Sequence, residues 1–232
     1  MLLVHNDIMI IERVTKDDLV SFIENNTQIR IDSFIESAFE TAEEVHAGIK
    51  REDGTSSFLE THVWPVTLDV IKHYQKSTHY LTTLQISSAI LHDVMEDNDR
   101  ILDLYTSHAY GFDAYFRHRF GEYVYAVANS LKTKPLENFS GASKEDQKLA
   151  RFADYCSLLS NSKYDTKIIK LADRLNNMKF ITQIPKHEKI KRYLKEAEDF
   201  YIAFSLFPPQ TLDFYNKIRI AYDNLKSLKI TA

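Results

Sequence analysis

The stretch LTTLQISSAILHDVMED, residues 81–97, combines a helical repeat of apolar side chains with an acidic end. The residues that carry the repeat are Leu81, Leu84, Ile90, Leu91 and Val94, and we expect the helix to end at the dipeptide His92-Asp93. Similar repeats occupy residues 31–45, 149–159, 193–204 and 212–225, and shorter ones occupy residues 64–74, 115–120, 122–131 and 166–175. Apolar residues at this spacing predict amphipathic helices, and therefore an all-α chain.

Chain breakers are scarce, because the 232 residues include only 5 Gly and 5 Pro. All-β folds and glycine-rich phosphate loops need such residues at their turns, so their scarcity favours long helices with few connections. Hydrophobic residues make up 44% of the chain and aromatic residues 12%, which excludes a disordered chain. We expect one domain over residues 1–232.

The net charge of −4 does not favour binding to nucleic acid or to a membrane surface, and we expect neither partner. The single cysteine, Cys156, excludes an internal disulfide and is typical of a reducing compartment, so we expect a cytoplasmic protein. No stretch reaches the ~20 apolar residues of a membrane helix.

The acidic end of the first stretch, LHDVMED at residues 91–97, holds an imidazole and three carboxylates: His92, Asp93, Glu96 and Asp97. On a helix, residues four apart share a face, so these groups would lie close together. The carboxylates repel one another unless a cation lies among them or water surrounds them. A metal site and a solvated helix end both fit this pattern.

A second polar group interrupts the apolar run KLADRLNNM at residues 170–178. If Asp173 is buried there, it needs a partner or a metal, and an ion pair with Lys170 or Arg174 is the structural alternative. A third polar residue, His62, stands at a predicted helix start, where a lone histidine is more often a hydrogen-bonded structural residue.

Together, His62, His92, Asp93 and Asp173 offer two imidazoles and two carboxylates. A mixed nitrogen and oxygen set suits a divalent ion with open water positions, such as Mn²⁺ or Fe²⁺. A cysteine-based zinc site is excluded, because the chain has one thiol.

In their order along the chain, these motifs resemble those of the HD-domain metal-dependent phosphohydrolases, most closely the hydrolase domain of RelA/SpoT-type enzymes and their small stand-alone relatives. The similar segments are VHAGIKREDG (45–54) followed by His62, LHDVMED (91–97), FGEYV (120–124) through KTK (132–134), and KLADRLNNM (170–178). The resemblance covers about residues 38–204. It implies an all-α HD-domain bundle of roughly nine to eleven helices, with residues 205–232 as a helical extension.

The resemblance also implies a function, the Mn²⁺-dependent removal of the 3′-pyrophosphate of (p)ppGpp, the nucleotide of the stringent response. Carried over by position, the metal ligands are His62, His92, Asp93 and Asp173, and the residues that handle the nucleophilic water are Glu96 and Asp97. The implied substrate contacts are Arg51 on the guanine base, Asn177 and Lys134. Lys132 is a further candidate for phosphate binding, whereas we expect Arg151 to be solvated surface.

The departures from the family pattern concern the base and the pocket. Glu52 replaces a basic residue, the loop between Gly54 and His62 is one residue longer, and Phe180 stands where a threonine is frequent. An HD phosphohydrolase that acts on NADPH, a dNTP or a nucleoside monophosphate, and a non-catalytic metal- or nucleotide-binding module, are therefore the alternatives. Residues 205–232 are too few for a synthetase domain, so we expect no synthesis, and they could instead form a homo-oligomer contact.

Overall fold

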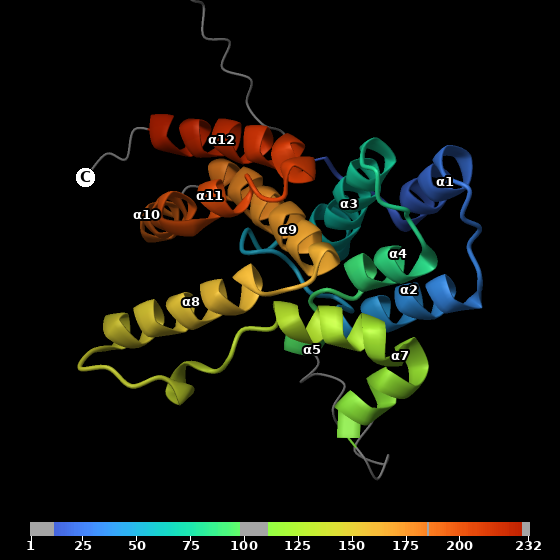
Figure 1. Ribbon diagram of the computed structural model, residues 1–232, viewed down its shortest axis with the longest axis horizontal. Helices are drawn as coiled ribbons and strands as arrows, with labels where there is room; N and C mark the ends of the chain where they lie inside the picture. The colour runs from blue at the N-terminus through green and yellow to red at the C-terminus, as the bar shows by residue number, and fades with distance from the viewer. Residues whose placement is uncertain (1–11, 98–110, 185, 229–232) are drawn as a thin grey trace, which may run out of the picture.

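The computed structural model describes residues 12–97, 111–184 and 186–228, which form an all-α fold (Figure 1). The N-terminal elements are α1 (Lys16–Asn26), α2 (Ser33–Val45), the π-helical turn η1 (Leu59–Val63), α3 (Trp64–Lys76), α4 (Thr83–Ile90), α5 (Val94–Asp97) and α7 (Gly111–Leu131). Within the described residues, the only β pairing is a single bridge between Lys50 and Ser57. The expectation of an all-α chain is confirmed.

The C-terminal elements begin with the short 3-10 turn η3 (Leu136–Asn138), α8 (Lys144–Ser160) and α9 (Tyr164–Gln183). They continue with α10 (His187–Glu196), the π-helical turn η4 (Ala197–Tyr201), α11 (Ile202–Phe204), η5 (Pro209–Thr211) and α12 (Leu212–Ser227). None of the helices in the described ranges has the length and apolar character to span a bilayer.

Local sequence signals start several of these helices. Thr15, Thr82 and Ser143 each form a capping box with the side chain three residues later, at the starts of α1, α4 and α8. Gly121 bends α7, because it adopts φ 76° and ψ 166°, a backbone region essentially restricted to glycine. The helix predicted in the stretch 81–97 is α4, which ends at Ile90, two residues before the expected end at His92-Asp93.

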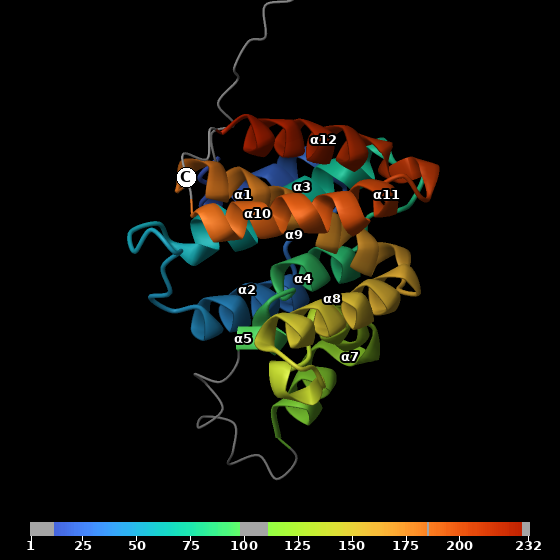
Figure 2. The same cartoon turned by 90° about the vertical axis from the view of Figure 1, so that its left-hand side faces the viewer.

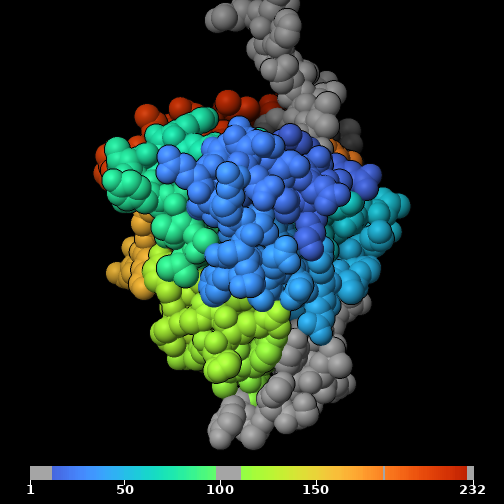
Figure 3. All heavy atoms as spheres, turned by 90° about the vertical axis from the view of Figure 1, so that its right-hand side faces the viewer, coloured from blue at the N-terminus to red at the C-terminus, as the bar shows by residue number. Residues whose placement is uncertain are grey.

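Two clusters of buried apolar side chains form the core. One cluster is built on α1, α2, α4 and α7, with Phe39, Trp64 and Phe116 among its largest members. The other surrounds α9 and includes Tyr201 and Phe214. Helix α3, which follows η1 directly, contributes side chains to both clusters. Figure 3 shows α1 and α2, with α7 beneath them, covering one face of the molecule.

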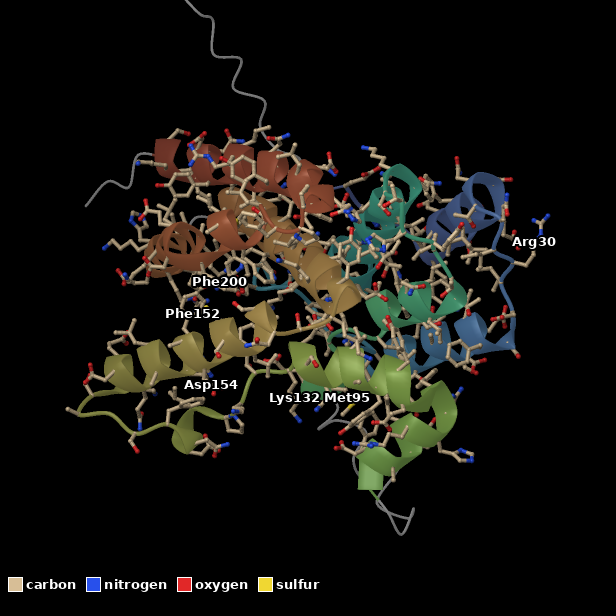
Figure 4. All side chains as sticks on the ribbon, viewed as in Figure 1. Arg30, Met95, Lys132, Phe152, Asp154 and Phe200 are labelled. Atoms are coloured by element: carbon tan, nitrogen blue, oxygen red, sulfur yellow. The ribbon has the colours of Figure 1, made fainter. Side chains whose placement is uncertain are left out.

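Helix α9 occupies the centre of the fold and packs against α3, α7, α10 and α12 (Figures 1 and 2). Most of its side chains are buried on every side, including Asp173 and Asn176. Beside it, α8 is held to η4 by an edge-to-face contact of Phe152 with Phe200, whose ring centres lie 6.3 Å apart (Figure 4). Polar groups on α9 are therefore carried by a helix with little freedom to move.

The buried carboxylate of Asp165 fixes the N-terminal end of α9. It accepts hydrogen bonds from the hydroxyls of Tyr74 on α3 and Tyr123 on α7. The amide of Gln85 on α4 donates a third, at 2.8 Å. One carboxylate thus joins four helices, and burial together with Asp165 raises the pKa of Tyr74 above its ordinary value.

We expect Asp165→Ala to lower the free energy of unfolding by about 2–4 kcal/mol, because it leaves two phenol groups without an acceptor in the interior. Asp154→Ala is the matched control, since Asp154 forms an exposed ion pair with Lys134, and such pairs are worth about 0–1 kcal/mol. Urea unfolding followed by circular dichroism measures both. Equal losses for the two variants would contradict the role of Asp165.

Candidate metal centre

The four predicted metal ligands come from three separate parts of the fold. His62 lies in η1, Asp173 lies on α9, and His92 and Asp93 follow the end of α4. Because α4 ends at Ile90, His92 and Asp93 lie in the turn before α5 and not on one continuous helix. The Asp93 carbonyl accepts backbone hydrogen bonds from Glu96 and Asp97, which ties the turn to α5.

Three of these residues form a compact group. The Asp93 Oδ2 atom lies 3.0 Å from His62 Nε2 and 3.2 Å from His92 Nε2. The two Nε2 atoms lie 3.3 Å from each other. Their ligand atoms all fall within 4.8 Å, so His62, His92 and Asp93 could hold a metal ion.

The orientation of both imidazoles fits a metal site. His92 Nδ1 lies 2.8 Å from the carbonyl oxygen of Ala89, and His62 Nδ1 lies 2.8 Å from Oδ1 of Asn176. Each acceptor requires a proton on Nδ1, so in the neutral ring the lone pair is on Nε2. Both lone pairs then face the same point, beside the Asp93 carboxylate. This arrangement calls for a positive charge between the rings, and ligating histidines are commonly oriented in this way.

Asp173 lies at the edge of this group, and its two carboxylate oxygens contact different residues. Its Oδ1 is 3.5 Å from His62 Nε2 and accepts a hydrogen bond from Asn177 Nδ2 at 2.5 Å. Its Oδ2 pairs with Lys170 Nζ at 2.6 Å. The structural ion pair considered from the sequence is therefore present, and it coexists with an oxygen that faces His62.

The charges within the group act on each other strongly. Burial alone would lower the pKa of His92, but the neighbouring Asp93 carboxylate outweighs it and raises the pKa to about 9. In turn, although burial opposes it, the pKa of Asp93 falls well below its ordinary value because His92 and His62 surround it. Without a metal, the neighbouring Asp93 carboxylate favours the protonated form of His92.

A cleft of about 400 Å³ opens onto the group, lined by His62, Asp93 and Asp173 among others. The predicted water-handling residues Glu96 and Asp97 also line it. Glu96 accepts a hydrogen bond from Thr133 Oγ1 at 2.9 Å, and the Asp97 carboxylate lies 3.8 Å from the buried His46 Nε2. Three of the four candidate metal ligands and both of these carboxylates therefore line one cleft.

Of the three predicted substrate contacts, one lines the cleft and two do not. Asn177 lines the cleft. Arg51 and Lys134 are not among the residues that line it: Arg51 is 8% exposed and bonds to two asparagines, while Lys134 pairs with Asp154. Arg151, expected at the surface, lies in the cleft wall.

Several residues of the site were not predicted from the sequence. Asn176 holds His62, and Lys148, Arg174 and Arg192 bring further positive charge to the cleft. Asn176 stands three residues after Asp173 on a helix, a spacing that puts both on neighbouring surface and could have indicated it. The other three belong to α8, α9 and α10, whose convergence is a property of the fold.

Comparison with known proteins supports a distant relationship. No protein-family model matches the chain. Over 157 residues, 68% of this chain, the sequence is 29% identical to a chloroplastic protein of Oryza sativa subsp. japonica named as a GTP diphosphokinase, RSH1, and the match spans 16% of that relative. Among solved structures, a metazoan ortholog of SpoT, described as hydrolysing ppGpp and playing a role in starvation responses, matches with a TM-score of 0.57. Its sequence identity is 16%, and the match covers 85% of this chain and 96% of that one. The similarity to RelA/SpoT-type proteins and the HD-like all-α fold are thus confirmed.

We expect Mn²⁺ binding at pH 7 to release about one proton, because His92, with a pKa of about 9, must lose its Nε2 proton to ligate a metal. Affinity should accordingly rise as the pH increases from 6 towards 9. Isothermal titration calorimetry in buffers of different ionisation enthalpy measures the released protons. His118→Ala, at an exposed position, should behave as the wild type, and His92→Ala should bind far more weakly. A binding enthalpy that does not change with the ionisation enthalpy of the buffer would contradict the assignment of His92 as a metal ligand.

Proposed function

We propose that the chain is a metal-dependent phosphohydrolase that removes the 3′-pyrophosphate of a (p)ppGpp-like nucleotide. The observation that carries this proposal is the cluster of His62, His92 and Asp93. The cleft beside this cluster is lined by His62 and Asp93 together with Glu96 and Asp97. The fold shared with the SpoT ortholog adds support, because that protein is described as hydrolysing ppGpp.

In this proposal, His62, His92, Asp93 and Asp173 hold the ion. Nitrogen and oxygen donors without a thiolate suit Mn²⁺, and Fe²⁺ is the other candidate. A divalent ion held there supplies Lewis-acid chemistry and makes a water nucleophile available near neutral pH. Lys170 neutralises part of the charge of Asp173, so the four residues can lie close together without excess repulsion.

Glu96 and Asp97 are the residues we propose to orient the attacking water and to take its proton. Both stand on α5, immediately after the turn that carries His92 and Asp93. The hydrogen bond from Thr133 restricts the rotation of the Glu96 carboxylate, as a general base requires. The proton of the attacking water therefore has a carboxylate acceptor on α5.

The positive residues of the cleft wall are suited to a polyanionic substrate. Arg151 forms no ion pair within the part of the chain that the structure describes, and its guanidinium is therefore available to phosphate oxygens. Lys148 and Arg192 stand nearby in the same wall. Asn177 adds an amide to the lining, and we propose that it contacts the nucleotide.

A second candidate substrate is another phosphorylated nucleotide, such as NADPH, a dNTP or a nucleoside monophosphate. The observation that favours it is the position of Arg51, which the family resemblance places against the guanine base. Here its guanidinium lies 3.9 Å above the Phe180 ring and is buried. A nucleobase would therefore not find the Arg51 guanidinium exposed for stacking, as a guanine site of the family would offer it.

A nucleotide panel incubated with Mn²⁺, with product identification, separates the two candidates. We expect ppGpp to yield pyrophosphate and a 5′-diphosphate nucleotide only when the ion is present. Turnover of another nucleotide with none of ppGpp would establish the second candidate. If no nucleotide is hydrolysed although Mn²⁺ binds, the chain is a non-catalytic binding module.

Replacing the proposed base gives a sharper test of mechanism. We expect Glu96→Gln to lower kcat by about 10²–10⁴-fold, the usual contribution of general acid–base catalysis, with Mn²⁺ affinity unchanged. Glu137→Gln, an exposed substitution of the same type on η3, serves as the control. Activity of Glu96→Gln equal to that of the control would remove Glu96 from the mechanism.

A further inference from the structure

A buried chain of hydrogen bonds leads from Arg51 to the candidate metal ligands. Arg51 Nη1 donates to Asn176 Oδ1 at 3.1 Å, and Arg51 Nη2 donates to Asn177 Oδ1 at 3.0 Å. Asn176 in turn holds His62, and Asn177 holds Asp173. The two prongs of one guanidinium thus end on two different ligands, one in η1 and one on α9.

The amide of Asn176 can adopt only one orientation in this chain. Its Nδ2 donates to the carbonyl oxygen of Thr61 at 3.1 Å, an atom that cannot donate. Its Oδ1 faces Arg51, a group that cannot accept. Asn176 Oδ1 must therefore receive the Nδ1 proton of His62, which leaves the lone pair on His62 Nε2 facing the metal site.

Arg51 is buried, and an aromatic ring covers its guanidinium. Its guanidinium packs on the face of Phe180, 3.9 Å from the ring centre, and the residue is 8% exposed. It does not line the cleft. Glu52, the next residue, pairs with Lys186 at 3.1 Å and with Lys189, and this anchors the same loop to the segment around α10. Of the two departures from the family pattern, Phe180 packs on the Arg51 guanidinium and Glu52 anchors the loop that carries Arg51.

We propose that Arg51 is a positioning residue for the metal site, acting through Asn176 on His62 and through Asn177 on Asp173, and is not a contact of the nucleobase. A planar guanidinium can serve both amides at once, whereas a lysine ammonium presents a single point charge. The inference rests on the proposed metal site but not on the identity of the substrate.

The central test is the Mn²⁺ affinity of Arg51→Lys, measured by isothermal titration calorimetry without substrate. We expect a loss of about 10–100-fold, the usual effect of removing a group that orients a metal ligand. At saturating Mn²⁺, KM for the hydrolysed nucleotide should stay within about twofold of the wild-type value. Unchanged Mn²⁺ affinity with a raised KM would overturn the proposal and identify Arg51 as a substrate contact.

Matched variants separate positioning from misfolding. Arg30→Lys makes the same substitution at an exposed arginine (Figure 4) and should change neither affinity nor KM. Asn176→Leu should lose Mn²⁺ affinity as Arg51→Lys does. Asn176→Asp keeps an acceptor for His62 but cannot donate to the Thr61 carbonyl, so it should lose less affinity than Asn176→Leu. Equal losses for the Leu and Asp variants would overturn the proposal.

The outcomes also distinguish this inference from the proposed function. If no nucleotide is hydrolysed but Arg51→Lys still weakens Mn²⁺ binding, the function fails and the positioning role stands. If the wild type hydrolyses ppGpp and Arg51→Lys binds Mn²⁺ normally, the function stands and the positioning role fails. A wild type that binds no Mn²⁺ overturns both.

Discussion

Two imidazole nitrogens that lie 3.3 Å apart, with a carboxylate oxygen within 3.2 Å of each, set the main physical constraint on this protein. The opposite ring nitrogens of His62 and His92 are committed to an amide and a backbone carbonyl, so both lone pairs point inward. Lone pairs in such proximity repel unless a positive charge lies between them. The Asp93 carboxylate favours a proton on His92 when no metal is present, and a divalent ion would supply the charge when bound.

The fold provides the rigidity that this constraint demands. The ligands come from η1, the turn after α4, and α9, which belong to different parts of the two apolar clusters. Asp165 ties α9 to α3, α4 and α7 at one end, and the Arg51 guanidinium ties α9 to the loop before η1 further along. Both ties run between segments that are remote in sequence, so a single helix could not create the site.

The helices and the candidate ligands could be predicted because they depend on local patterns. Apolar spacing indicated α2, α8 and α12, and the motif order indicated His62, His92, Asp93 and Asp173. The burial of Arg51 could not be predicted, since its partners lie 125 and 126 residues away and its aromatic neighbour departs from the family pattern. The apolar repeat indicated the end of α4 to within two residues, at the dipeptide His92-Asp93 compared with the observed Ile90.

Anomalous diffraction from crystals grown with Mn²⁺ tests the central claim most directly. Data collected on the two sides of the manganese absorption edge locate the ion without assuming its ligands. We expect one strong peak within ligating distance of His62 Nε2, His92 Nε2 and the Asp93 carboxylate. A peak elsewhere, or none at this cluster while Mn²⁺ is present in excess, would contradict it.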